Sequence, residues 1–233
     1  MLERKSLVLV IASLFAAPLH ANEWNGEGEL GFTSTSGNTE SDTLNAKLGV
    51  GTAHGAWKHN AKFNVLKASD SGVDSADSIL FTEKSEYRFA EKTFAFGKLK
   101  HEEDKFSGFD HQSVVSLGLG HVFLETDIHT LEASVGIGYR DTEDDLGVSE
   151  SEGIVMGDLD YKYVISATAK FNQKLEIESG DTNTFSKSET FLKVVVNGNL
   201  SAKFGYEIKH NSDVPAGTDK TDTLTAVTLV YGF

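Results

Sequence analysis

The chain has 233 residues, with 35 Asp and Glu against 21 Lys and Arg, and carries a formal net charge of −14 at pH 7. This acidic balance argues against nucleic acid as a partner, because phosphate backbones select basic surfaces. The sequence contains no cysteine, which excludes a disulfide framework and thiol chemistry.

Residues 1–21 have the features of a secretory signal peptide. Arg4 and Lys5 form a basic start, and the apolar run at 7–17 is too short to cross a bilayer as a helix. We therefore expect 1–21 to be removed on export and 22–233 to form one domain; a buried N-terminal helix is the alternative. No other stretch approaches 18 apolar residues, so a membrane-spanning form of this chain has to be a β-barrel.

Beyond the leader, apolar and polar residues alternate with a period of two, which is typical of strands with one apolar face. In the first segment, for example, Leu30 and Phe32 alternate with Glu27 and Glu29. The segment 94–103 is ambiguous in phase. The predicted strands are 24–33, 43–52, 57–67, 78–89, 94–103, 113–123, 130–140, 154–164, 167–178, 186–196, 200–210 and 222–233.

The gaps between these segments alternate in length. Short gaps such as 90–93 and 197–199 alternate with long polar ones such as 68–77, 141–153 and 211–220. This pattern, with an even strand number, is typical of bacterial outer-membrane barrels, whose long loops face outward and whose short turns face the periplasm. The sequence therefore predicts an all-β, closed antiparallel up-and-down transmembrane β-barrel of about 12 strands in the outer membrane. A soluble periplasmic β-barrel that acts as a binding module is the alternative.

The last predicted strand places aromatic and aliphatic residues on one face. A soluble protein seldom leaves such an amphipathic edge unpaired, whereas a barrel closes it against the first strand. We interpret this face as lipid-facing and as the signal that the barrel-assembly machinery reads. Its residues are Phe233, Tyr231, Leu229 and Val227.

The opposite faces of the strands carry charges of both signs and are predicted to line the lumen. They either border a narrow water-filled passage or form ion pairs that brace the barrel. We expect long side chains to fill most of the lumen, because twelve strands enclose less space than the 16–18 of general porins. The predicted lumen charges are Glu27, Glu29, Lys47, Lys58, Lys62, Lys84, Glu86, Arg88, Glu132, Asp158, Asp160, Lys162, Lys170, Lys174, Glu176, Glu189, Lys203, Glu207 and Lys209.

Catalytic signals in the sequence are weak. A lipid-modifying hydrolase would need a Ser–His pair on the outer face, and His101 with Ser113 or Ser116, or His121 with Ser134, are the candidates. The chain has no G-x-S-x-G element and no metal motif among its histidines, so we expect no catalytic residues, no cofactor and no resident metal.

Two predicted outer loops are rich in carboxylates, which suit weak divalent-cation binding and bridging to lipopolysaccharide phosphates. A solvated acidic loop is the simpler interpretation. The residues are Asp141, Glu143, Asp144, Asp145, Glu150 and Glu152 in one loop and Asp70, Asp74 and Asp77 in the other.

Several motifs together resemble a known family. The chain is similar to the salt-induced outer-membrane proteins called domain of unknown function 481, over essentially all of 22–233. The resemblance implies an outer-membrane β-barrel with a link to salt stress, and it supplies no catalytic residues. The motifs are 24–32 (WNGEGELGF), 36–39 (SGNT), 94–97 (FAFG), 104–110 (DKFSGFD), 117–120 (LGLG) and 229–233 (LVYGF).

Two of these motifs have a physical interpretation as loops. Gly37 and Asn38 suit the positive-φ positions of a turn. Phe106 and Phe109 either anchor an outer loop over the barrel mouth or are exposed at the membrane rim.

The functional expectation is a narrow channel for ions and small solutes, or an envelope-stability protein important under salt or osmotic stress. A lipid-modifying hydrolase is the alternative. The expected partners are outer-membrane lipids and lipopolysaccharide, with the barrel-assembly machinery during biogenesis, and the expected state is a monomer.

Overall fold

The computed structural model describes residues 24–35, 41–144 and 146–233. The predicted leader, 1–21, lies outside these ranges, as do Gly37 and Asn38 of the predicted first outer turn. The predicted domain boundaries therefore stay a prediction.

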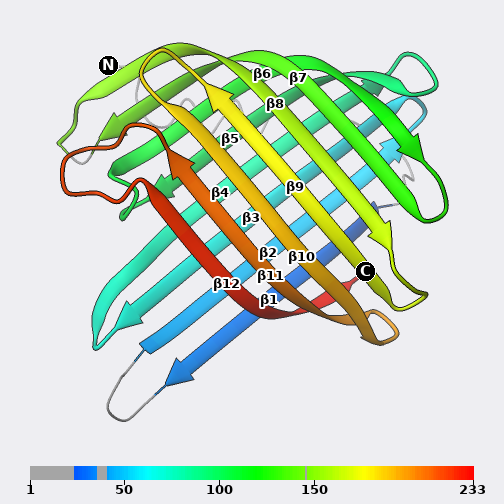
Figure 1. The fold of residues 1–233 in the computed structure, drawn as a ribbon, viewed down its shortest axis with the longest axis horizontal. Helices are drawn as coiled ribbons and strands as arrows, with labels where there is room; N and C mark the ends of the chain where they lie inside the picture. Colours follow the sequence, from blue (N-terminus) through cyan, green and yellow to red (C-terminus); the bar gives the residue numbers. More distant parts are fainter. Residues whose placement is uncertain (1–23, 36–40, 145) are drawn as a thin grey trace.

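Twelve antiparallel strands form one closed barrel in the described part of the chain (Figure 1). Each strand pairs with its neighbours in sequence, and β1 closes against β12. The predicted strand number, up-and-down order and closure are confirmed. The strands are β1 (Trp24–Thr35), β2 (Ser41–His54), β3 (Trp57–Asp70), β4 (Val73–Arg88), β5 (Thr93–Asp104), β6 (Phe109–Glu125), β7 (His129–Asp144), β8 (Ser149–Val164), β9 (Ala169–Ser179), β10 (Thr184–Asn197), β11 (Leu200–Asn211) and β12 (Thr221–Gly232).

Most connections at both ends of the barrel have two to four residues in the described part of the chain, and only the β11–β12 connection there is longer. The end that carries the turn between β10 and β11, at the lower right of Figure 1, is called the turn end. The opposite, loop end carries the red 212–220 connection at the left, which is one residue shorter than the predicted gap 211–220. The prediction of long loops at 68–77 and 141–153 was wrong.

Both of those segments continue the strands instead. β3 and β4 extend to a two-residue turn at Ser71 and Gly72, which have φ values of 53° and 78°. Lys67 still pairs with Asp77 in the register of these strands. The alternation of apolar and polar residues ends where both faces of the sheet become polar, but the backbone hydrogen bonds between the strands continue. The sequence pattern therefore underestimated the strand lengths.

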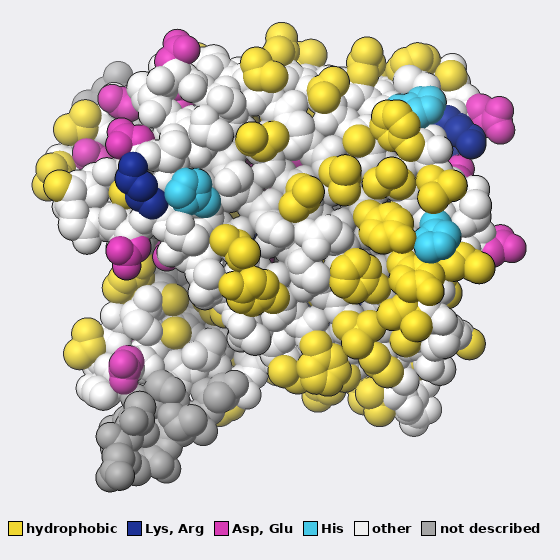
Figure 2. Space-filling model, viewed as in Figure 1, with side chains coloured by type: hydrophobic (Ala, Val, Ile, Leu, Met, Phe, Trp, Pro, Cys, Tyr) yellow, Lys and Arg dark blue, Asp and Glu magenta, His cyan; other side chains and the backbone are white. Residues whose placement is uncertain are grey.

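The outer surface is an apolar band. Val115, Leu117, Val135 and Ile137 point outward from β6 and β7 and are 59–67% exposed. Figure 2 shows hydrophobic side chains over much of the visible face, whereas charged side chains gather toward its two edges. No helix in the described ranges is long and apolar enough to cross a membrane.

The interior is packed along the wall formed by β5 to β8. Phe94, Phe96 and Met156 form a buried cluster there. Small residues on β6 and β7 make room for the rings: a Cβ on Gly118 would meet Phe96, and one on Gly120 would meet Phe94. This packing resolves the phase of 94–103, whose even-numbered residues face inward.

Candidate functional site in the barrel lumen

The structure places the predicted lumen charges on the inward face of the barrel. Eighteen of the nineteen line one of two neighbouring cavities. The exception is Arg88, which lies exposed beside a turn and donates a 3.4 Å hydrogen bond to the Glu91 carbonyl oxygen. The alternate residues of these strands face outward instead.

The larger cavity has a volume of about 570 Å³. It extends from Glu27 and Lys58 near the turn end to Glu102 and Lys209 near the loop end. Eleven lysines and eight carboxylates line it. The cavity wall is therefore net cationic, although the whole chain carries a net charge of −14.

One buried ion-pair cluster crosses the lumen from β5 to β8 and β9. Lys100 Nζ donates to Glu176 Oε1 and to Glu178 Oε2, each at 3.2 Å. Lys98 Nζ donates to Glu176 Oε2 at 3.0 Å and lies 3.5 Å from Asp158 Oδ1. These strands are not neighbours in the barrel, so the pairs join strands that have no backbone hydrogen bonds to each other.

A second cluster joins β1, β2, β10 and β11. Lys203 Nζ donates to Glu29 at 3.0 Å and to Glu189 at 3.3 Å, and Lys47 lies 3.8 Å from the same Glu189 carboxylate. Near the turn end, Lys193 donates to Glu27 at 2.6 Å. The expectation that charged side chains fill much of the lumen holds at these clusters, and the cavity occupies the remaining space.

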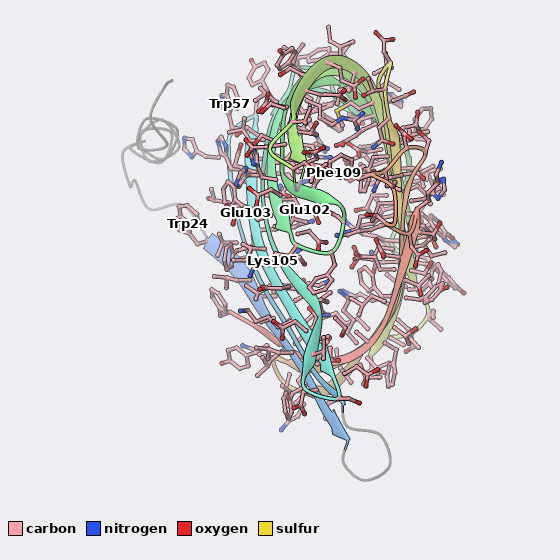
Figure 3. All side chains as sticks on the ribbon, turned by 90° about the vertical axis from the view of Figure 1, so that its left-hand side faces the viewer. Trp24, Trp57, Glu102, Glu103, Lys105 and Phe109 are labelled. Carbon is pink, nitrogen blue, oxygen red and sulfur yellow. The ribbon has the colours of Figure 1, made fainter. Side chains whose placement is uncertain are left out.

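Side chains cross the lumen near its loop end. Lys209 donates to Glu102 at 2.5 Å across the barrel, from β11 to β5. Phe109 lines the small pocket above this pair, whereas Phe106 is 44% exposed. Figure 3 looks at this end and shows Glu102 and Phe109 toward the inside of the barrel and Glu103 toward the outside.

Buried Arg140 ties the outer parts of three hairpins together. It donates to the Glu152 carboxylate and to the Asn183 carbonyl oxygen. The Asn183 side chain in turn donates to Asn211 at 2.7 Å. The loop end is thus fixed from β7 around to β11.

Sequence reasoning missed several charged residues of these clusters. Lys98, Lys100 and Glu102 were missed because strand 94–103 has its large aromatics inside, so neither face appeared polar. The glycines opposite those aromatics, at 118, 120 and 136, were the available signal. Glu178, Lys187 and Arg140 lie at or near the outer ends of the predicted strands 167–178, 186–196 and 130–140, and they were not assigned to the lumen.

The proposed Ser–His pairs fare differently. Ser116 is buried on the lumen side, away from His101, and Ser134 faces Asp158 at 3.4 Å while His121 bonds to Thr93 at 3.0 Å. The pairings of His101 with Ser116 and of His121 with Ser134 were therefore wrong. In each, the histidine faces outward and the serine faces the lumen, because side chains alternate between the two faces of a strand.

His101 does meet Ser113 on the outer surface. Its Nδ1 lies 2.8 Å from Ser113 Oγ, and its Nε2 lies 3.6 Å from Glu103 Oε1. Both residues of the pair have register partners in the adjoining strands, so their backbone N–H groups belong to β-ladders rather than to an oxyanion hole. Similar cross-strand pairs join His59 to Ser85 and His210 to Thr221, which indicates a shared structural role.

The acidic residues near β7 and β8 mostly have local partners. Asp144 Oδ1 accepts hydrogen bonds from the backbone N–H groups of Leu146 and Val148 at 2.9 and 2.8 Å. Asp141 accepts one from Ser151. Within the described ranges, which omit Asp145, no three His, Asp or Glu side chains form a group that could hold a metal ion.

Comparison with known proteins agrees with this architecture. The family model described as "Protein of unknown function, DUF481" matches residues 28–233. The chain belongs to the DUF481 family. A relative described as uncharacterized protein YdiY, from Escherichia coli (strain K12), is 26% identical over 213 residues, which cover 88% of this chain and 82% of the relative.

Solved structures with a similar fold are outer-membrane barrels. The COG4313 outer membrane channel from Pseudomonas putida F1 matches with a TM-score of 0.56 and 11% identity, over 92% of this chain and 97% of that chain. The NanC porin matches with a TM-score of 0.53 and 10% identity, over 90% of this chain and 98% of that chain. At these identities the likeness shows the fold alone: this DUF481 chain has the fold of an outer-membrane β-barrel.

Proposed function

We propose that the protein is an integral outer-membrane barrel whose lumen is a narrow passage for ions and small solutes. The observation that carries the proposal is the cavity of about 570 Å³ that extends through most of the lumen. A single water molecule needs only about 10–15 Å³ of such space, so this cavity has room for a hydrated ion. The apolar outer band supports a place in the membrane.

The passage has a different ion pair at each end. Near the turn end, Lys193 pairs with Glu27, whose side chain is 55% exposed, and an exposed pair of this kind opens readily because it contributes only about 0–1 kcal/mol. Near the loop end, Lys209 and Glu102 are only 19% and 10% exposed. We therefore infer that Lys209 and Glu102 form the main constriction.

Conductance of the refolded protein in planar bilayers tests the passage. The double variant Glu102→Ala and Lys209→Ala is expected to raise single-channel conductance at least about twofold, because removing both side chains widens the constriction. Glu103→Ala is the matched control, since Glu103 follows Glu102 in β5 but is exposed on the outer surface, and its conductance is expected to stay at the wild-type value. Absence of conductance in all three proteins, across salts and voltages, would refute the passage.

An envelope-stability role is the second candidate, and the cross-lumen pairs of Lys98 and Lys100 with Glu176 favour it. These pairs join non-adjacent strands across the lumen and have little contact with solvent. Bilayers that remain silent, together with a barrel whose unfolding depends strongly on these pairs, would favour this role over transport. A link to salt stress belongs to either candidate and is tested by growth of a deletion strain at high salt.

A further inference from the structure

We propose that Lys62 and Lys174 bind a small oxyanion inside the lumen, namely a carboxylate or a phosphate carried by a passing solute, and that Lys170 lies further along its path. The inference rests on the proposed passage for its biological use, but the site itself is a property of the cavity wall. An anion-binding site in the lumen would give the proposed channel a preference for anions over cations.

The three lysines differ from the rest of the cavity wall in lacking a counter-ion. Each of the other eight lysines that line the cavity has a carboxylate oxygen within 4.0 Å. In the described part of the chain, no carboxylate lies within that distance of Lys62, Lys170 or Lys174. Three lysine side chains thus face the cavity with hydrogen-bond donors that no carboxylate occupies.

The positions of these lysines bring two of them together from opposite walls. Lys62 lies on β3 and Lys174 on β9, which are not neighbours in the barrel. Both side chains line the same cavity and therefore face it from two different parts of the wall, with Glu189 and Asp160 also on its lining. Two like charges in a confined space repel each other, and an anion between them removes that repulsion.

The surrounding side chains suit an oxyanion. Asn60 and Asn64 flank Lys62 on the same face of β3, and Asn172 precedes Lys174 by two residues on β9; all three line the cavity. Their amide N–H groups are neutral donors for carboxylate or phosphate oxygens. The Lys174 ammonium lies 5.6 Å from the centre of the Phe191 ring and makes a cation–π contact with it.

Lys170 lies between the proposed site and the turn end of the lumen. It lies four residues before Lys174 on the same strand face, about 13 Å away along the strand toward the turn end. An anion that leaves the Lys62–Lys174 pair therefore meets another unpaired cation on the way through the lumen.

Binding and selectivity are measured separately, so that this inference and the passage can fail independently. Titration calorimetry of the refolded barrel uses citrate and inorganic phosphate as probes, with wild type, the double variant Lys62→Gln and Lys174→Gln, and Lys193→Gln as the matched control. Lys193 lines the same cavity but is paired with Glu27. We expect the double variant to bind at least tenfold more weakly and the control to bind like wild type.

The stronger of the two probes identifies the anion class: citrate points to carboxylates and phosphate to phosphorylated solutes. Equal binding by all three proteins, or no binding by wild type, overturns the site. Reversal potentials in a KCl gradient then test selectivity, which is expected to shift from anions toward cations in the double variant. Binding without conductance would refute the passage and leave the site standing, whereas conductance with unchanged selectivity and unchanged binding would refute the site.

Discussion

At the scale of single residues, the barrel interior combines two kinds of packing. Around Phe94, Phe96 and Met156 the inner wall is apolar, and the two rings pack against glycines of β6 and β7. Elsewhere, including further along β5 and β8, the lumen is lined largely by lysines and carboxylates. The first part resembles the core of a soluble protein and the second part keeps space for water.

Gly118 is the position at which this packing tolerates least change. A Cβ there would meet the Val135 carbonyl oxygen, would approach the Gly136 Cα to 2.6 Å, and would meet the Phe96 ring at 2.8 Å. Since backbone cannot move aside as a flexible side chain does, we expect Gly118→Ala to lower the free energy of unfolding by about 1–3 kcal/mol. Urea unfolding of the refolded barrel, followed by tryptophan fluorescence, measures the change.

Gly28→Ala is the control for this substitution. Gly28 also lies within a strand, but a Cβ there would have no atom within 4 Å. Its unfolding midpoint is expected to remain close to that of wild type. Equal effects of the two substitutions would contradict the account of the packed wall.

At the scale of elements, the loop end is shaped by contact between two connections. The β5–β6 connection includes Gly108, with a φ of 81°, and a Cβ on this residue would meet Pro215 Cδ and Thr218 Oγ1 of the β11–β12 connection, both at 2.9 Å. These two segments are separated by about a hundred residues in sequence but touch at the same end of the barrel as the Lys209–Glu102 pair.

Gly108→Ala is therefore expected to loosen the β11–β12 connection. Gly147→Ala is the matched control, because Gly147 has a φ of 78° but no atom within 4 Å of a Cβ. Each substitution introduces backbone strain of about 1–2 kcal/mol, but only Gly108→Ala also pushes against Pro215 and Thr218. Limited proteolysis at Lys220 should become several-fold faster in Gly108→Ala alone, and equal rates in the two variants would contradict the contact.

Much of the element structure could be predicted from the sequence because a lipid-exposed strand has to alternate. The twelve strands, their order and the short turns follow from that constraint. The strand ends between β3 and β4 could not be predicted in this way, because polar residues there continue the ladder beyond the apolar band. Strand 94–103 could not be assigned a phase because Phe94 and Phe96 face inward.

The candidate site was predictable only in part. Alternation identified which face of each strand bears charge, and it placed Lys62 and Lys174 on the inner one. It could not show which charges meet, since Lys100 and Glu178 are 78 residues apart and join through the curvature of the whole barrel. For the same reason, the absence of a counter-ion at Lys62 is visible only in the closed structure.

At the scale of the whole molecule, the barrel depends on a short closing seam. β1 and β12 are registered over four pairs, from Glu27–Gly232 to Leu30–Leu229. Gly26 and Phe233 extend this seam by two backbone hydrogen bonds of 2.8 and 2.9 Å, and the Phe233 ring lies against Gly26. Closure removes the edges of β1 and β12, which would otherwise be open to pairing with other chains.

The role of Phe233 can be divided between its backbone and its ring. Deletion of Phe233 removes both hydrogen bonds to Gly26, whereas Phe233→Ala keeps the bonds and removes only the ring. If the ring is part of the signal that we propose the barrel-assembly machinery reads, both variants will reduce the amount of folded barrel in the outer membrane several-fold. If Phe233 only completes the seam, the deletion will reduce it and Phe233→Ala will not. Heat-modifiable gel mobility of membrane fractions measures the folded amount, and in-vitro refolding into detergent supplies the control, because no assembly machinery is present there. Phe233→Ala that refolds normally in vitro but fails to accumulate in membranes would support the assembly signal, and normal accumulation would refute it.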